Sequence, residues 1–131
     1  MYALSIKQPW ASLISSGQKT AEIRSWQTQY RGPLVICASA KKHINHDGPY
    51  GCLISIVELV DIVPFTRDLC GAACIDWIKN HYAWRINVVV NLPPIQVRGQ
   101  LKLFKLPHPI TSALHRYPTV AQYIRALRSV A

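Results

Sequence analysis

The chain has 131 residues, half of them apolar, so it can bury the core of one compact domain and is too short for several. Fifteen lysines and arginines stand against six acidic residues, which gives a net charge of +9. This balance favours a polyanionic partner such as nucleic acid, although a basic soluble protein without such a partner would have the same composition. All six acidic residues lie within the first 76 positions. The rest of the chain carries eight basic residues: Lys79, Arg85, Arg98, Lys102, Lys105, Arg116, Arg125 and Arg128.

The first third of the chain predicts a strand, a helix and a second strand. Residues 2–6 alternate between apolar and polar side chains, which is typical of a strand. Pro9 suits the start of a helix over residues 10–16, and Gly17 is a natural end for it. Residues 19–26 (KTAEIRSW) alternate again and predict the second strand.

The middle of the chain predicts two further strands separated by a loop, then a helix and another strand. Residues 34–40 form a nearly continuous apolar run, as expected for a buried strand of a barrel. Residues 41–50 are polar and predict a loop or a short helix, and residues 51–63 form the longest strand-like stretch. Apolar residues at helical spacing predict a helix over residues 66–80, and a strand over residues 82–90 follows.

The last third predicts one more strand and a terminal helix. Leu92-Pro93-Pro94 should break the preceding strand. Residues 96–106 alternate clearly, with Val97, Leu101 and Leu103 expected to face the core, and residues 118–130 predict a helix. Short strands with interspersed helices indicate an α+β fold whose strands close into a small barrel.

Several kinds of site are disfavoured by the sequence. Cys37 and Cys52 sit in apolar runs and are expected to be buried thiols, and the four-residue spacing of Cys70 and Cys74 does not match a zinc knuckle. The segment His43–Asp47 has the composition of a metal site but is better explained as a polar loop, so we expect no metal. Phosphate-binding glycine motifs are missing, so no cofactor is expected. We find neither a signal peptide nor a long apolar run, which predicts a cytoplasmic protein without a membrane partner.

The second predicted strand holds the best candidate site. Alternation places Ala21 and Ile23 on one face, and it places Thr20, Glu22, Arg24 and Trp26 on the other. On an open surface Glu22 and Arg24 would be an ordinary ion pair of little value. An indole beside an arginine, however, is a platform on which a nucleic-acid base can stack.

Two further charged residues leave alternatives open. Lys19 could neutralise a phosphate or, with a lowered pKa, act as a base or nucleophile, and it could equally be a plain exposed lysine. Glu58 lies in the middle of an apolar strand, where a carboxylate needs a partner. It could pair with a cleft cation such as Arg24 or Lys19, or it could point out of the barrel.

The stretch from Leu4 to Lys42 contains an ordered series of motifs. They are Gln8-Pro9-Trp10-Ala11, Gly17-x-Lys19-Thr20-x-Glu22, Arg24-x-Trp26, Tyr30-Arg31-Gly32 and Ala38-Ser39-Ala40-Lys41. With this series the chain resembles the ASCH (activating signal cointegrator homology) domain, and the resemblance continues more loosely to residue 107. It implies an ASCH domain over residues 1–107 and a C-terminal helical extension over residues 108–131. The implied fold is that of PUA-like domains, a β-barrel of about five to six strands flanked by helices, with a cleft lined by the second strand.

The same resemblance implies binding of RNA, of a modified nucleoside or of single-stranded nucleic acid, and it also suggests an enzyme as an alternative. A bacterial branch of the family hydrolyses N4-acetylcytidine with a lysine that Lys19 matches, a threonine whose position Glu22 occupies, and a later glutamate that has no match after residue 63. The first hypothesis is therefore an RNA-binding module. The alternative is an amidohydrolase or ribonuclease with Lys19 and Glu22 in the active site, and a protein-interaction domain is a third, weaker hypothesis.

In the binding hypothesis, Trp26 and Trp84 stack on a base, Glu22 accepts a hydrogen bond from a base edge or ribose, and cations hold phosphate. The residues predicted to contact the ligand are Lys7, Gln8, Trp10, Lys19, Thr20, Glu22, Arg24, Trp26, Arg31, Ser39, Lys41 and Trp84.

Overall fold

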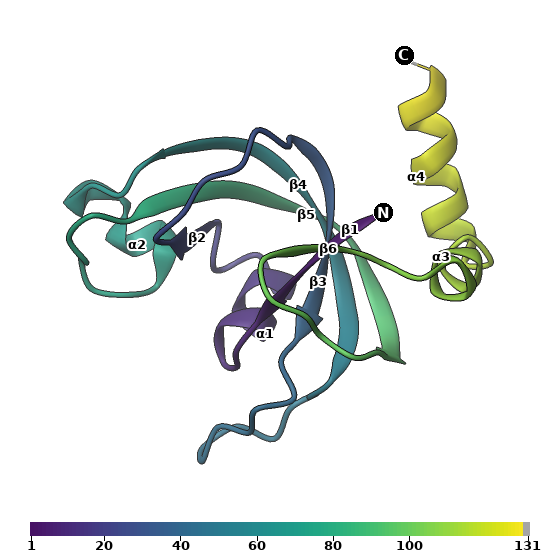
Figure 1. The fold of residues 1–131 in the computed structure, drawn as a ribbon, viewed down its shortest axis with the longest axis horizontal. Helices are drawn as coiled ribbons and strands as arrows, with labels where there is room; N and C mark the ends of the chain where they lie inside the picture. The colour runs from purple at the N-terminus through teal and green to yellow at the C-terminus, as the bar shows by residue number, and fades with distance from the viewer. Residues whose placement is uncertain (130–131) are drawn as a thin grey trace.

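One mixed sheet of six strands curls into a half-barrel in the computed structural model, which describes residues 1–129 (Figure 1). The spatial order is β2-β5-β4-β3-β1-β6; β1 and β3 run parallel, and all other neighbours are antiparallel. Within the described residues β2 and β6 are the two edges, so the barrel is not closed between them. The strands are β1 (Tyr2–Ile6), β2 (Ala21–Arg24), β3 (Gly32–Ala38), β4 (Cys52–Pro64), β5 (Tyr82–Gln96) and β6 (Leu103–Lys105).

The helices gather at three places around the sheet, which confirms the α+β class with a C-terminal helix. Figure 1 shows α2 at one end of the molecule and α3 with α4 at the other, while α1 lies below the curved sheet between them. The helices are α1 (Trp10–Ser15), the 3₁₀ turn η1 (Arg67–Leu69), α2 (Cys70–Ala73), α3 (His108–Leu114) and α4 (Pro118–Ser129). Residue 130, the last of the predicted terminal helix, lies outside the described residues.

The apolar run of β3 is explained by burial of both faces of the sheet. Leu34 and Ile36 belong to the apolar cluster inside the half-barrel, together with α1. Val35 and Cys37 belong to a second cluster on the outer face, where α3 and α4 cover the sheet. Because successive side chains of a strand point to opposite faces, a strand buried on both sides is apolar throughout.

The helix predicted over residues 66–80 is wrong in extent. The only helical turns there are η1 and the four-residue α2, which is terminated by Cys74, the next residue, with φ of 57° in the left-handed region. Trp77 lies within the predicted helix range but outside both turns, and its indole Nε1 donates a hydrogen bond to the carbonyl of Phe65 at 3.0 Å. This bond ties the irregular segment 75–80 back to the end of β4. Helical periodicity alone could not reveal this competing long-range contact.

The predicted strand break at residues 92–94 is also wrong, since β5 continues to Gln96. Asn91 pairs with Ser55 and Ile95 pairs with Leu53, so β5 carries extra residues at this point relative to β4. Pro93 and Pro94 lie within this irregularity. Some residues of a bulge make no hydrogen bond to the neighbouring strand. Proline, which has no backbone N–H to donate, is therefore tolerated there.

The strand predicted over residues 96–106 is largely a loop, and only β6 remains of it. Lys102 has φ of 56°, and Leu101, expected in the core, is 92% exposed. The loop over residues 97–102 instead approaches β1 closely at Gly99, where an added Cβ would lie 3.1 Å from the hydroxyl of Ser5. The helix α3 lies within the helical extension that the resemblance implied over residues 108–131, although the residue pattern itself predicted a helix only from residue 118.

Residues 41–50 carry no regular helix or strand, in agreement with the predicted loop. All four cysteines are free, and Cys37 and Cys52 are buried as expected. A helix long and apolar enough to cross a membrane does not occur within residues 1–129.

Candidate functional site

A pocket of about 1180 Å³ lies on the open side of the half-barrel. One wall comes from β2, and the facing wall comes from the end of β1 and from the loop 97–102 that leads into β6. The irregular segment 75–78 contributes a third wall. A curved sheet that fails to close between its edge strands thus leaves a cavity, and chain segments without regular structure surround its mouth.

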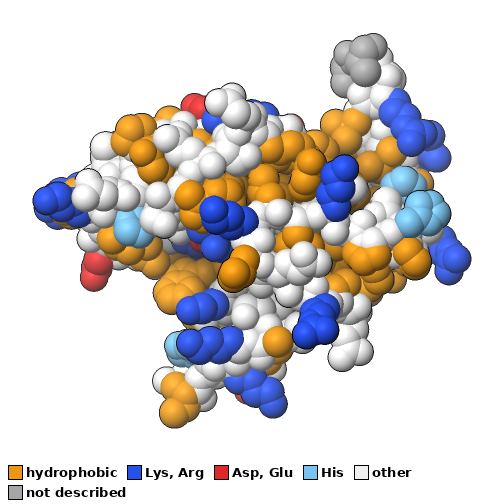
Figure 2. Space-filling view, viewed as in Figure 1, with side chains coloured by type: hydrophobic (Ala, Val, Ile, Leu, Met, Phe, Trp, Pro, Cys, Tyr) orange, Lys and Arg blue, Asp and Glu red, His pale blue; other side chains and the backbone are white. Residues whose placement is uncertain are grey.

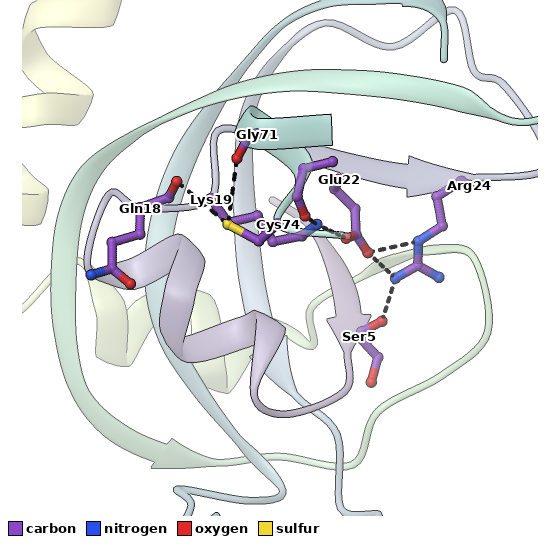
Figure 3. A network of polar contacts seen from close by, with 8 residues as sticks. Ser5, Gln18, Lys19, Glu22, Arg24, Gly71 and Cys74 are labelled. Carbon is purple, nitrogen blue, oxygen red and sulfur yellow. Dashed lines mark hydrogen bonds and ion pairs between the residues drawn. The ribbon is translucent and has the colours of Figure 1, made fainter. Parts of the chain in front are cut away.

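Glu22 is the centre of the polar network in this pocket (Figure 3). Its Oε2 accepts a hydrogen bond from Nε of Arg24 at 3.0 Å and lies 2.8 Å from the Nη2 of the same side chain. Its Oε1 lies 3.6 Å from Nζ of Lys19. Within residues 1–129, ion pairs between side chains occur only here, and Glu22 is the acidic partner in both of them. The strand alternation is confirmed here, because Glu22 and Arg24 share one face of β2.

Lys19 is almost fully buried, with 2% of its side chain exposed. Its Nζ donates a hydrogen bond to the backbone carbonyl of Ala73 in α2. Burial lowers the pKa of Lys19 from its usual value of 10.5, and the carboxylate of Glu22 opposes that shift. Gly17, with φ of 83°, allows the sharp turn after α1 that brings Lys19 to this place. Of the two alternatives for Lys19, the plain exposed lysine is wrong.

Arg24 fixes the two sides of the pocket to each other. Its Nη2 donates a hydrogen bond to the backbone carbonyl of Ser5 in β1 at 2.9 Å, across the gap that no strand pairing closes. The Arg24 side chain is 24% exposed, so part of its guanidinium can contact a ligand. Since both of its bonds are charge-assisted or made to a rigid backbone, the site is held in place before any ligand enters.

The floor of the pocket offers one free acceptor next to free donors. Oε2 of Glu22 is engaged by Arg24, whereas Oε1 has only the long 3.6 Å ion pair. An ammonium group has three donors, and Lys19 spends one of them on Ala73. The arrangement can therefore accept a hydrogen bond from a ligand N–H or O–H and donate one to a neighbouring ligand oxygen or nitrogen.

The rim of the pocket combines positive charge with apolar surface. Lys7, Arg98 and Lys102 line it as cations against the single acid Asp76, and Trp10 and Ile78 line it as apolar groups. Figure 2 shows Lys and Arg side chains around the middle of this face of the molecule, with hydrophobic side chains between them. Such a rim complements a ligand that has both anionic groups and flat apolar faces.

The structure brings half of the predicted ligand residues together in this pocket. They lie just after β1, at the start of α1, just before and within β2, and just after β3, and they converge although they are up to 32 positions apart in the sequence (Lys7 and Ser39). The predicted residues that line the pocket are Lys7, Trp10, Lys19, Glu22, Arg24 and Ser39.

Trp84 and Trp26 do not offer the open stacking platform that was expected. Trp84 is completely buried, and its Nε1 donates a hydrogen bond to the carbonyl of Trp26 at 3.2 Å. The two rings meet edge to face with centroids 4.7 Å apart. Trp26 lies beside the pocket, with Nζ of Lys102 5.7 Å from its ring centroid. We therefore assign Trp84 to the core.

The remaining predicted residues lie outside the pocket wall. Gln8 is buried, donates to the carbonyl of Pro49 and accepts from the backbone N–H of Ser12, so it joins the loop before β4 to α1. Three others are exposed away from the wall: Thr20, Lys41 and Arg31, whose guanidinium donates to the nearby carbonyls of Thr28 and Tyr30.

Sequence analysis missed the segments 75–78 and 97–102 as pocket walls. Trp77, Arg98 and Lys102 were assigned to a helix or a strand, and only the basic character of the second half of the chain hinted at their role.

Glu58 turns away from the pocket, and its Oε2 accepts a hydrogen bond from the hydroxyl of Tyr123 in α4 at 2.8 Å. No group of three His, Cys, Asp or Glu side chains in the described part of the chain is placed to hold a metal ion.

Comparison with known proteins identifies relatives in both sequence and fold. The family model described as the ASCH domain matches residues 4–99. Human activating signal cointegrator 1 is 38% identical over 81 residues, and its mouse counterpart is 36% identical over the same length. Each match covers 46% of this chain and only 14% of the relative, so this chain spans a small part of those proteins.

Solved structures of ASCH from Zymomonas mobilis share the fold. The first superposes with a TM-score of 0.67 at 17% identity, and the match covers 86% of this chain and 92% of the other. A single-substitution variant of the same protein gives a TM-score of 0.62 at 17% identity over 86% and 94% of the two chains. At this level of identity the likeness supports the architecture alone.

Proposed function

This chain belongs to the ASCH domain family, and from that premise we propose that it binds single-stranded RNA and takes one unpaired nucleoside into the pocket of Lys19, Glu22 and Arg24. The observation that carries the proposal is the donor and acceptor set on the pocket floor, buried behind a basic rim. Glu22 is 7% exposed and Lys19 2%, so a ligand must enter the pocket to reach them. A base inside a duplex cannot do so, whereas an unpaired or extruded base can.

Base edges match the groups on the floor. An exocyclic amine or a ring N–H would donate to Oε1 of Glu22, and an adjacent ring nitrogen or carbonyl would accept from Lys19 or Arg24. A ligand without these groups would displace water from Oε1 of Glu22 and from the remaining N–H donors of Lys19 without replacing its hydrogen bonds, which is costly. The polar floor therefore selects for a base over an apolar ligand of similar size.

Phosphate groups match the rim. Lys7, Arg98 and Lys102 line the mouth of the pocket, where the sugar-phosphate backbone of a strand would pass. Neutralising phosphates with such cations releases counterions, so the affinity should fall steeply with salt. Trp10 and Ile78 add apolar surface against which a base or ribose can pack.

The test is fluorescence-anisotropy titration of a labelled single-stranded RNA over a range of salt concentrations. The double variant Arg98→Gln/Lys102→Gln should reduce the slope of log affinity against log salt by about 1.4, since each phosphate contact on a single strand contributes roughly 0.7. The matched control is Arg85→Gln, an exposed arginine on β5 that is not part of the pocket. RNA affinity that does not depend on salt, or that is unchanged in the double variant, would rule the proposal out.

A second candidate function, hydrolysis of a modified nucleoside or of RNA, is favoured by the state of Lys19. Its lowered pKa increases the fraction of neutral amine at a given pH, and a neutral amine can act as base or nucleophile. As a base, the amine would take a proton from the attacking water or hydroxyl group, and Oε1 of Glu22, 3.6 Å away, would relay that proton to the leaving group. Such an activity should increase with pH up to the pKa of Lys19 and be lost in Lys19→Arg, which keeps the charge but stays protonated.

The discriminating assay is incubation with N4-acetylcytidine and with short RNAs, followed by chromatography of the products. Product that forms with the native protein and is absent with Lys19→Arg supports hydrolysis. Absence of turnover from acid to alkaline pH, together with retained RNA binding, leaves the binding function alone.

A further inference from the structure

We propose that the RNA strand continues from the pocket along β6 onto the C-terminal helices, where a basic surface holds its phosphates. This basic extension consists of Lys105, Arg116, Arg125 and Arg128. The inference rests on the proposed RNA binding, and it adds a second contact region outside residues 4–99, the part of the chain that the family model matches.

The positive charge of this surface is not neutralised within the protein. All four side chains are exposed, and none of them forms an ion pair within residues 1–129. No acidic residue follows Asp76 in the sequence, so a local partner on the same helices does not exist. Arg125 and Arg128 lie one helical turn apart on α4 and repel each other without a counter-charge, and a polyanion would relieve that repulsion.

The basic extension is continuous with the rim of the pocket along the chain. Lys102 lines the pocket, β6 begins at the next residue, and Lys105 ends it, with its Nζ 5.9 Å from the ring of Tyr2. The chain then enters α3 at His108. Figure 1 shows this path running from the front of the half-barrel to α3 and α4 at its right, and Figure 2 shows Lys and Arg side chains along that face.

The extension is also anchored to the sheet, through α3 and the first half of α4. Leu114 and Val120 are fully buried in the outer apolar cluster, and Tyr123 donates its hydrogen bond to Glu58 of β4. Arg125 and Arg128 lie three positions apart on α4 and therefore project from neighbouring places on its exposed side. Because the helix that carries them is already formed and anchored at its start, only the arginine side chains have to be ordered when RNA binds, which limits the entropic cost.

An RNA strand fits this surface better than a membrane does. A helix that lies on a bilayer buries an apolar face in the lipid. The apolar stripe of α4 is already packed on the sheet through Val120, Tyr123 and Ile124. What α4 presents to solvent near its end is charge, and charge continuous with a nucleoside pocket suits a sugar-phosphate backbone.

The experiment compares the triple variant Arg116→Gln/Arg125→Gln/Arg128→Gln with the native chain on single-stranded RNAs of about 4 and about 16 nucleotides, the span of site sizes seen for single-strand binders. For the long RNA, three lost phosphate contacts should reduce the salt slope by about 2, so lowering the salt from about 200 to about 50 mM should strengthen native binding about 20-fold more than variant binding. Binding of the short RNA, which the pocket alone can hold, should not change.

The matched control is Lys79→Gln/Arg85→Gln, which removes exposed charges at the opposite end of the molecule, near α2. An equal loss per charge in the control would mean that net charge alone attracts RNA, and the inference would fall. The inference would also fall if the triple variant bound the long RNA as tightly as the native chain does. The same holds if the substitutions weakened binding to phosphatidylserine vesicles and left RNA binding unchanged. Failure of the native chain to bind either RNA would instead refute the proposed function itself, so the two failures can be told apart.

Discussion

Replacing Glu22 with glutamine should destabilise the protein strongly, because two cations would lose their counter-charge in one place. Glutamine keeps the size and shape of the side chain and removes only the negative charge. Lys19 is 2% exposed and could not be hydrated, whereas Arg24 is 24% exposed and keeps its bond to Ser5. Most of the loss in stability should therefore come from Lys19, whose buried charge would have no counter-charge.

The size of the effect follows from this difference in burial. Removing one partner of a fully buried ion pair costs about 3–5 kcal/mol. Because Arg24 reaches solvent, and because Lys19 can lose its proton instead of remaining a bare buried charge, we expect a loss of about 2–4 kcal/mol in the free energy of unfolding at pH 7. That loss is a large share of the roughly 5–15 kcal/mol by which domains are stable.

The penalty should depend on pH in a defined direction. Burial already lowers the pKa of Lys19 below its value of 10.5 in an unfolded chain, and loss of the Glu22 carboxylate removes the main influence that raises it. Between the folded and unfolded pKa values the unfolded chain binds more protons, so stability rises with pH in that window. The window is wider in the variant, and the difference between native and variant should shrink as the pH approaches 10.5.

Urea unfolding at several pH values, followed by tryptophan fluorescence, measures this difference directly. Asp61→Asn is the matched control, because Asp61 is exposed on β4 and its carboxylate bonds only the next backbone N–H. It should change stability by less than about 0.5 kcal/mol. Two results would contradict this expectation: a Glu22→Gln variant as stable as the control, or a loss in its free energy of unfolding that grew toward pH 10. The ion pairs of Glu22 with Lys19 and Arg24 would then not govern the stability of the protein.

Three further predictions concern residues outside the pocket. Trp84→Phe should lower the free energy of unfolding by about 1–3 kcal/mol in urea titrations, because it leaves a void and a carbonyl without its donor, while RNA affinity stays unchanged; a selective loss of affinity would return Trp84 to the site. Tyr123→Phe should cost about 1–2 kcal/mol through the lost bond to Glu58 and speed proteolysis of α4. Burial raises the pKa of Tyr123 above its usual value of 10.0, so the native advantage over this variant should be constant below pH 10 and decline above it; an advantage that grew there would contradict the assignment. Iodoacetamide should alkylate the exposed Cys74 and spare Cys37, whose burial raises the pKa of its thiol to about 11, and mass spectrometry of the native protein that found Cys37 modified first would disprove this order.

The sequence determined the centre of the site because its geometry is local. Alternation along a strand follows from the backbone pleat, so Glu22 and Arg24 share a face whatever surrounds them. The turn at Gly17 places Lys19 just before the same strand. The ASCH motifs mark these positions too, and most of the strands were found for the same local reason.

The tertiary structure decided which groups surround that centre and which are removed from it. The carbonyls of Ala73 and Ser5 that hold Lys19 and Arg24 come from segments far away in the sequence, and no spacing rule points to them. Segment 75–78 and loop 97–102 became pocket walls only because long-range contacts prevailed over their local periodicity. Trp84 shows the opposite case. Its place on a strand was predictable, but its complete burial depends on how the sheet curls, and curvature is a property of the whole sheet rather than of any one strand.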